Sequence, residues 1–278
     1  MTERLKKQGM DDGTAAFDTA AEDFARLAPR LWDPLGRALV DRTAPRTGER
    51  VLDACCGAGA SALPAARAVG VGGMVDAVDL SAALAELGRR AARELPQLRF
   101  HHGDVTAWRP TDGPYDLVQS AYGIFFLPDM DAGSKHLVSL LRPGGRFAVQ
   151  TWRRGALAGY ARCLFEAVAD EAQRTMQRPP SATASERIDS PAKLGAWLDA
   201  LGLADVRVED VPFAQPLTPE LAWDLALGTG WRHLLRDLDG AAVSRIRAGL
   251  LTCIEERHLA ELDAGSLVGI GVRPYRES

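Results

Sequence analysis

The sequence has little cysteine and no regular cysteine spacing. Its 278 residues include four cysteines, Cys55, Cys56, Cys163 and Cys253. Only the first two are adjacent, and no CxxC pair occurs, so we expect no zinc site and no other bound metal. Free thiols in a reducing cytoplasm are the simplest interpretation of so few, irregularly placed cysteines.

Lysine is also scarce, and the basic residues never gather into a block. Lysine occurs only at positions 6, 7, 135 and 193, and the formal net charge is -4. A chain without a basic patch gives no reason to expect nucleic acid or a membrane surface as a partner.

Long apolar runs are missing as well. No segment approaches the roughly 20 apolar residues of a membrane helix, so we expect no membrane partner. Residues 1–13 lack the apolar run of a signal peptide, and we therefore expect a cytoplasmic protein.

What the sequence does contain is an ordinary globular composition with a clear alternation of elements. Hydrophobic residues make up 46% and charged residues 25% of the chain, enough for a sizeable core. Short apolar runs predict strands at 50–55, 73–80, 98–104, 115–122 and 146–152, with helices near 60–69, 81–94 and 130–141. This alternation predicts an α/β fold with a doubly wound, mostly parallel sheet covered by helices on both faces.

The alternation stops after Trp152. The remaining predictions are helices over 14–43, 156–178 and 191–201, a mobile loop over 178–187, strands at 205–213 and 266–274, and helix without strand over 218–262. We expect one domain overall, divided into an N-terminal helical segment (1–45), a cofactor-binding α/β core (46–152), a helical cap and lid loop (153–204), and two last strands with a helical insertion (205–278). Loops after parallel strands lie at their carboxyl edge, where open α/β sheets bind ligands.

A glycine-rich turn follows the first predicted strand, in the sequence DACCGAGASA. Gly57, Gly59 and Ala62 fit the G-x-G-x-x-A fingerprint of a dinucleotide site, and Asp79 lies 20 residues after Gly59 at the end of the second strand. On these residues alone, NAD binding is a reasonable interpretation. A P-loop is excluded, because no Gly-Lys-Ser/Thr follows.

Three further features favour a different ligand. Asp53 lies at the end of the first strand, where its carboxylate repels a pyrophosphate but attracts an ammonium or sulfonium group. Asp104 follows the third strand, where it can accept a hydrogen bond from an adenine amine or cap the next segment. The sequence LLRPGGRFAV (140–149) predicts a helix end, a Pro-Gly-Gly turn and a strand.

Taken together, these motifs resemble those of class I S-adenosylmethionine-dependent methyltransferases, in the small-molecule branch that includes quinone-biosynthesis and natural-product enzymes. The resemblance covers residues 14–152 well and the remainder loosely. It implies a seven-stranded Rossmann-like sheet with the last strand antiparallel, S-adenosyl-L-methionine as cofactor, and methyl transfer to a small, largely apolar or aromatic acceptor. The family usually has glycine where this chain has Cys55, and glycine permits a positive φ.

The resemblance also implies roles for the matched positions. The positions that would contact the methionine part or the sulfonium are Asp53, Cys55, Gly57, Gly59, Ser120 and Ala121. The positions that would contact the ribose or the adenine are Asp79, Leu80, Asp104 and Val105.

Residues on the acceptor side are less constrained by motif. Tyr122 and His233 are the candidate catalytic residues, because an oxygen acceptor must lose a proton. Trp32, Trp152 and Trp231 are candidate walls of the substrate pocket. Each of these five residues has a plain alternative as a packing or surface residue.

Two other functions stay open at this point. An NAD(P)-dependent oxidoreductase is disfavoured by Asp53 and by the LRPGG segment, and no Tyr-x-x-x-Lys pair is present. A cofactor-binding relative repurposed for a cyclisation would keep the same binding motifs. The sequence leaves open the acceptor, the atom that is methylated, any general base, and whether the chain forms a homodimer.

Overall fold

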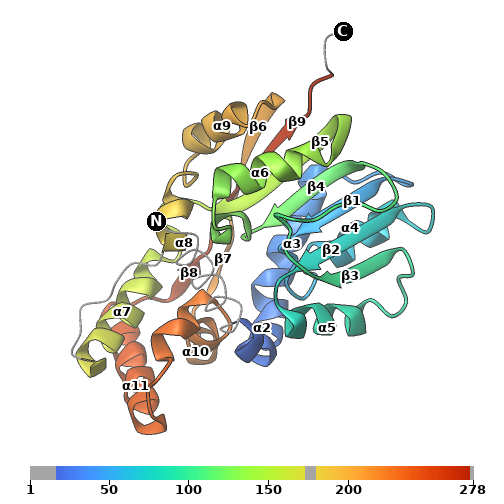
Figure 1. The fold of residues 1–278 in the computed structure, drawn as a ribbon. Helices are drawn as coiled ribbons and strands as arrows, with labels where there is room; N and C mark the ends of the chain where they lie inside the picture. Colours follow the sequence, from blue (N-terminus) through green and yellow to red (C-terminus); the bar gives the residue numbers. More distant parts are fainter. Residues whose placement is uncertain (1–16, 173–179, 276–278) are drawn as a thin grey trace.

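A seven-stranded sheet forms the centre of the computed structural model, which describes residues 17–172 and 180–275 (Figure 1). Its strand order is β3-β2-β1-β4-β5-β9-β6. The strands are β1 (Arg50–Ala54), β2 (Met74–Asp79), β3 (Leu98–His102), β4 (Tyr115–Ala121), β5 (Leu141–Trp152), β6 (Ala204–Val211) and β9 (Ser266–Val272). The first five strands are parallel, and β9 is antiparallel to β5 and β6. The predicted fold class is therefore confirmed.

Helices precede, separate and follow these strands. The α-helices that lie wholly within the described residues are α2 (Ala21–Leu27), α3 (Trp32–Thr43), α4 (Ala62–Val69), α5 (Ala82–Ala91), α6 (Met130–Ser139), α7 (Ala158–Ala172), α8 (Pro180–Glu186), α9 (Pro191–Ala200), α10 (Pro219–Leu227) and α11 (Gly240–Glu256). Short 3₁₀ helices are η1 (Ala28–Arg30), η2 (Ile124–Phe126) and η3 (Gly230–Leu235). Local sequence fixes several starts, since Ser81 and Asp129 accept backbone N–H bonds at the beginnings of α5 and α6.

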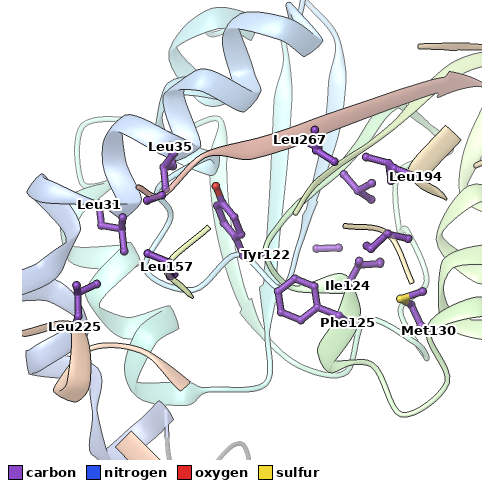
Figure 2. Close-up of a cluster of buried hydrophobic side chains, with 14 of the residues drawn as sticks. Leu31, Leu35, Tyr122, Ile124, Phe125, Met130, Leu157, Leu194, Leu225 and Leu267 are labelled. Atoms are coloured by element: carbon purple, nitrogen blue, oxygen red, sulfur yellow. The ribbon is translucent and has the colours of Figure 1, made fainter. Parts of the chain in front are cut away.

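The sheet is covered on both faces, as its apolar strands require. Leu39 of α3 and Ala66 of α4 belong to the core on one face. Leu137 of α6 and Leu194 of α9 belong to the core on the other face, where Leu194 lies close to Leu267 of β9 (Figure 2). The helices on the two faces leave the carboxyl ends of the parallel strands uncovered. The turns that follow these strands meet at one edge of the sheet.

A second group of elements lies beside the sheet and is drawn at the lower left of Figure 1. It contains α7, α8, α10 and α11, with a two-stranded sheet of β7 (Ala214–Pro216) and β8 (Glu261–Asp263). We call α7, α10, η3 and α11 the cap. The strand β8 was not expected within the helical segment 218–262. It is only three residues long and is held by pairing with β7, so no alternating pattern marks it in the sequence.

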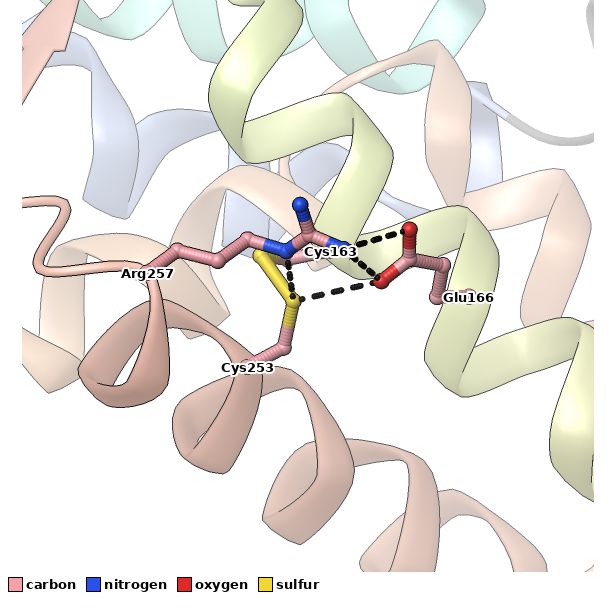
Figure 3. Close-up of a disulfide and its surroundings, with 4 residues drawn as sticks. All are labelled: Cys163, Glu166, Cys253 and Arg257. Carbon is pink, nitrogen blue, oxygen red and sulfur yellow. Dashed lines mark hydrogen bonds and ion pairs between the residues drawn. A yellow bond between two sulfur atoms is a disulfide. The ribbon is translucent and has the colours of Figure 1, made fainter.

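A disulfide joins two helices of the cap, which corrects the expectation of four free thiols. Cys163 of α7 and Cys253 of α11 are bonded, with their Cα atoms 5.5 Å apart, and 90 positions separate them in the sequence (Figure 3). Glu166 and Arg257 form an ion pair beside the bond, at 2.8 Å. Cys55 and Cys56 are free, as expected.

Two other expectations need correction. The predicted mobile loop contains helix α8, which packs near η2 and begins at Pro180, because proline is well suited to the first turn of a helix. The Pro-Gly-Gly segment, which was predicted to be a turn, lies inside β5 and interrupts its regular pairing with β4. Tyr115 pairs with Leu141 and Leu117 pairs with Arg146, so the segment between Leu141 and Arg146 bulges out of the ladder.

Across the residues that the structure describes, no helix has the length and apolar character needed to cross a bilayer.

Candidate functional site

The carboxyl ends of four neighbouring strands bring the predicted acidic residues to one edge of the sheet. Asp53 of β1 pairs in register with Ala77 of β2 and Gln119 of β4. Asp79 ends β2 beside His102 of β3. The topology therefore gathers at one edge side chains that are far apart in the sequence, which is where doubly wound sheets bind ligands.

The turn after β1 has a conformation that favours glycine at three positions. Cys55, Gly57 and Gly59 have φ values of 57°, 54° and 96°. A cysteine at positive φ is strained by comparison with glycine, so Cys55 occupies a backbone conformation that glycine adopts more readily. The ring of Phe24 lies over this turn, 3.3 Å from the position that a Cβ on Gly57 would occupy.

Asp53 is fully buried and only partly hydrogen-bonded. Gln119 donates to its Oδ2 at 3.1 Å, whereas Oδ1 has no partner. Burial raises the pKa of Asp53 to about 6, and the side chains of Ser61 and Gln119 oppose that rise. A buried carboxylate without a cation is unfavourable in the free protein, so a positively charged group is the natural complement of Asp53.

Asp79 fixes the turn from the neighbouring strand. Its Oδ2 accepts the N–H of Gly57 at 2.8 Å, and its Oδ1 accepts the N–H of Ser81 at 2.8 Å. Burial raises the pKa of Asp79, while these two backbone bonds lower it. Each carboxylate oxygen can accept a further hydrogen bond, so the geometry leaves room for two hydroxyl donors.

Asp104 follows β3 and caps the next segment. Its Oδ1 accepts the N–H and the hydroxyl of Thr106, at 2.8 Å and 2.7 Å. This is the capping interaction that the sequence left as the alternative to adenine binding. Leu80 is partly exposed beside Asp79, and Val105 is buried beside Asp104.

Several buried polar atoms near the same edge have no hydrogen-bond partner. Besides Asp53 Oδ1, they are Ser120 Oγ, both amide atoms of Gln150, Thr151 Oγ1 and Trp32 Nε1. Buried polar groups are nearly always paired in folded proteins. Their concentration at the ends of β1, β4 and β5 indicates that this edge is built for a polar ligand, and Gln150 and Thr151 carried no signal in the sequence.

Aromatic rings gather beside these atoms. The ring centroids of Tyr122 and Trp152 are 4.1 Å apart, and Trp32 lies 5.9 Å and 6.2 Å from them. Phe24 stacks on Trp32 at 5.2 Å, so the group of rings reaches the glycine turn. We call Phe24, Trp32, Tyr122 and Trp152 the aromatic cluster. Sequence reasoning missed Phe24, which lies in an amphipathic helix with no motif.

Tyr122 is held firmly within the cluster. It has a φ of 55°, and its N–H donates to Gln150 O at 2.9 Å. Its hydroxyl forms a hydrogen bond with Ser266 of β9, and burial raises its pKa well above the ordinary range. The phenol is therefore neutral at physiological pH, and Figure 2 shows its hydroxyl end directed toward the β9 ribbon, on the side of Leu35.

The other two acceptor-side candidates have different neighbours. Trp231 contacts Tyr160 and Phe165 of α7, with ring centroids 5.2 Å and 6.3 Å away. His233 lies on η3, and its Nδ1 is hydrogen-bonded to Gly230 O at 2.5 Å. The structure thus brings Trp32, Tyr122 and Trp152 together and places Trp231 and His233 in the cap.

Several known proteins are similar to this chain in sequence. Residues 51–145 match a family described as a methyltransferase domain. The chain is 37% identical over 137 residues to aklanonic acid methyltransferase DauC of Streptomyces sp. (strain C5), covering 49% of this chain and 62% of that protein. It is 28% identical over 247 residues to nocamycin O-methyltransferase of Saccharothrix syringae, covering 83% and 88%. The chain thus spans less than two thirds of the length of the first of these relatives.

Fold similarity extends further than sequence similarity. Phosphoethanolamine N-methyltransferase 2 of Haemonchus contortus, solved with phosphomonomethylethanolamine and S-adenosylhomocysteine, superposes with a TM-score of 0.51 at 18% identity. The match covers 86% of this chain and 52% of that one.

Proposed function

We propose that this chain is a class I S-adenosylmethionine-dependent methyltransferase that transfers a methyl group from S-adenosyl-L-methionine to a small natural-product acceptor, which its similarity to methyltransferases supports. The observation that carries the proposal is the edge of buried carboxylates, above all Asp53 with its unpaired oxygen. A cationic nucleoside complements this edge, whereas a dinucleotide would bring two phosphates toward it.

The residues at the edge fit such a cofactor. Asp53 and Ser120 have buried oxygens without partners, and Asp79 has lone pairs left for the two ribose hydroxyls. We assign Asp104 and Val105 to the adenine, although Asp104 also caps its own segment. Cys55, Gly57, Gly59, Leu80 and Ala121 complete the proposed contacts. When bound, the cofactor supplies an electrophilic methyl group on a sulfonium.

The aromatic cluster is the proposed floor of the acceptor site. Trp32 and Trp152 offer apolar surface next to the glycine turn, and Tyr122 is fixed by Ser266. We therefore propose a largely apolar or aromatic acceptor. Holding the acceptor in line with the methyl group can lower the barrier by about 7–11 kcal/mol, so positioning is the main contribution asked of these residues.

Tyr122 and His233 remain the proposed catalytic residues. The neutral phenol of Tyr122 is suited to orienting an acceptor rather than to removing its proton, because burial disfavours the phenolate. His233, with Trp231 beside it in η3, is the proposed proton acceptor on the side of the cap. We further propose that the core of residues 46–152 serves the cofactor and that the segments after it serve the acceptor.

Titration with S-adenosylhomocysteine tests the cofactor assignment. We expect the wild-type protein to bind it, and Asp79→Ala to weaken binding at least tenfold, because two ribose hydrogen bonds and the support of Gly57 are lost together. Asp112→Ala, which removes an exposed carboxylate paired with Arg99, is the matched control and should bind normally. Binding of NADH instead, or unchanged affinity in Asp79→Ala, would contradict the proposal.

A further inference from the structure

The cap contains a cavity of about 350 Å³ that is separate from the carboxylate edge. Three aliphatic side chains line it, Leu227, Leu235 and Val243. Arg232, His233 and Arg236 also line it, with Thr19 at one side. Among the described residues that line it, none is an aspartate or a glutamate. The cavity therefore combines an apolar wall with cationic or protonatable nitrogen, whereas the cofactor edge is lined by carboxylates.

We propose that this cavity, which we call the cationic cavity, binds the anionic group of a partly apolar acceptor. The inference rests on the proposed function and names a class of acceptor, an aromatic or polycyclic molecule that carries a carboxylate or a comparable anion. Arginine is suited to this role, because its planar guanidinium presents several donors to a carboxylate at once.

The donors at the cavity are partly held in place. Arg232 forms an ion pair through one terminal nitrogen with Asp23 of α2, which leaves its other N–H groups as donors. Its side chain is 27% exposed, so it is sheltered without being fully buried. His233 donates through Nδ1 to Gly230 O, so Nε2 of the neutral ring is an acceptor and the arginines are the donors for the anion. Anchored donors lose less conformational freedom when an anion binds.

The cationic cavity is linked to the proposed reaction site through two contacts. Phe126, in the 3₁₀ turn after β4, lies 3.7 Å from the position of a Cβ on Gly230, the first residue of η3. Asp23, the partner of Arg232, directly precedes Phe24, whose ring covers the glycine turn. An acceptor anchored in the cavity is thus held by elements that contact the ends of β1 and β4.

A pair of probes that differ only in charge tests the proposal. Naphthalene-2-carboxylate and the neutral naphthalene-2-carboxamide are titrated into the full chain by calorimetry. We expect the carboxylate to bind at least tenfold more tightly than the carboxamide. Arg236→Gln should remove that preference, and Arg67→Gln, which deletes an exposed arginine at the end of α4, should retain it.

Equal binding of the two probes to the wild-type chain, or an unchanged preference in Arg236→Gln, overturns the proposal. Arg232→Gln is the second variant, used if Arg236→Gln does not fold, and it should reduce the preference in the same direction. S-adenosylhomocysteine is titrated into the same proteins. Wild-type affinity for it in the variants, together with a lost carboxylate preference, locates the effect in the cavity. Failure of the wild type to bind S-adenosylhomocysteine would instead contradict the proposed function while leaving the anion result intact.

Discussion

At the scale of single residues, Asp53 shows how a residue proposed to bind a ligand can oppose folding. Its carboxyl group is fully buried, and burial raises its pKa to about 6 from an ordinary value of 3.8. The folded protein therefore holds this proton more tightly than the unfolded chain does. The resulting contribution to the free energy of unfolding is fully present below pH 3.8 and is lost as the pH rises through 6. The full shift corresponds to about 3 kcal/mol at neutral pH.

Asp53→Asn removes this charge while keeping the shape of the side chain. We expect the variant to be about 1–3 kcal/mol more stable than wild type at pH 7.5, with a smaller difference at pH 5, and to bind S-adenosylhomocysteine more weakly. Urea unfolding at the two pH values measures the stability. A variant that is less stable than wild type at pH 7.5 would show that the carboxylate is compensated in the free protein.

Cys55 also has an unfavourable feature at the scale of a single residue, which is its left-handed backbone conformation. At a φ of 57°, Cys55→Gly relaxes the backbone but loses the side-chain packing against Gly123, so we expect stability within about 1 kcal/mol of wild type. Cys55→Val places a β-branched residue at the same φ and should cost about 1–3 kcal/mol. Thermal unfolding of both variants measures these differences in stability. Equal stability of Cys55→Val and wild type would mean that the turn is not left-handed at this residue.

At the scale of elements, the disulfide between α7 and α11 is the strongest constraint on the cap. Its two cysteines are 90 residues apart, so the bond removes much of the freedom of the unfolded chain. We expect the Cys163→Ser, Cys253→Ser double variant to lose about 2–4 kcal/mol in urea unfolding. Thiol titration of the unreduced, unfolded wild type should find only Cys55 and Cys56 reactive. Four reactive thiols would show that the bond does not form.

Helix α2 is the element that connects the two parts of the proposed site. It contributes Phe24 over the glycine turn and Asp23 to Arg232 of η3. From η1, Arg30 forms an ion pair with Asp224 of α10. These contacts join the cofactor edge to the cap through one short segment, and its seven residues are stabilised by what they touch on either side rather than by helix propensity alone.

At the scale of the whole molecule, ligand binding at the carboxylate edge should raise the thermal stability of the protein. A ligand that binds only the folded state at 100 times its Kd adds about 2.7 kcal/mol, which for a protein of this size raises Tm by roughly 5–10 °C. We expect S-adenosylhomocysteine to produce such a shift in wild type and none in Asp79→Ala, by thermal unfolding. A shift with NADH but none with S-adenosylhomocysteine would contradict the assignment at this scale.

The sequence by itself determined the parallel part of the sheet and the edge that we propose for the ligand. Strand and helix periods are local, so the alternation between residues 49 and 149 predicted the parallel part of the sheet, and that topology places Asp53 and Asp79 at one edge. The roles of individual side chains toward a ligand stay predictions.

Only the tertiary structure decided which distant residues meet. Cys163 with Cys253, Tyr122 with Ser266 and Phe24 with the glycine turn join segments whose spacing carries no local period. Strand β8 and helix α8 are likewise short and depend on their surroundings. A sequence pattern records the preference of each segment, whereas these contacts follow from how distant segments pack against one another, and packing is a property of the folded chain.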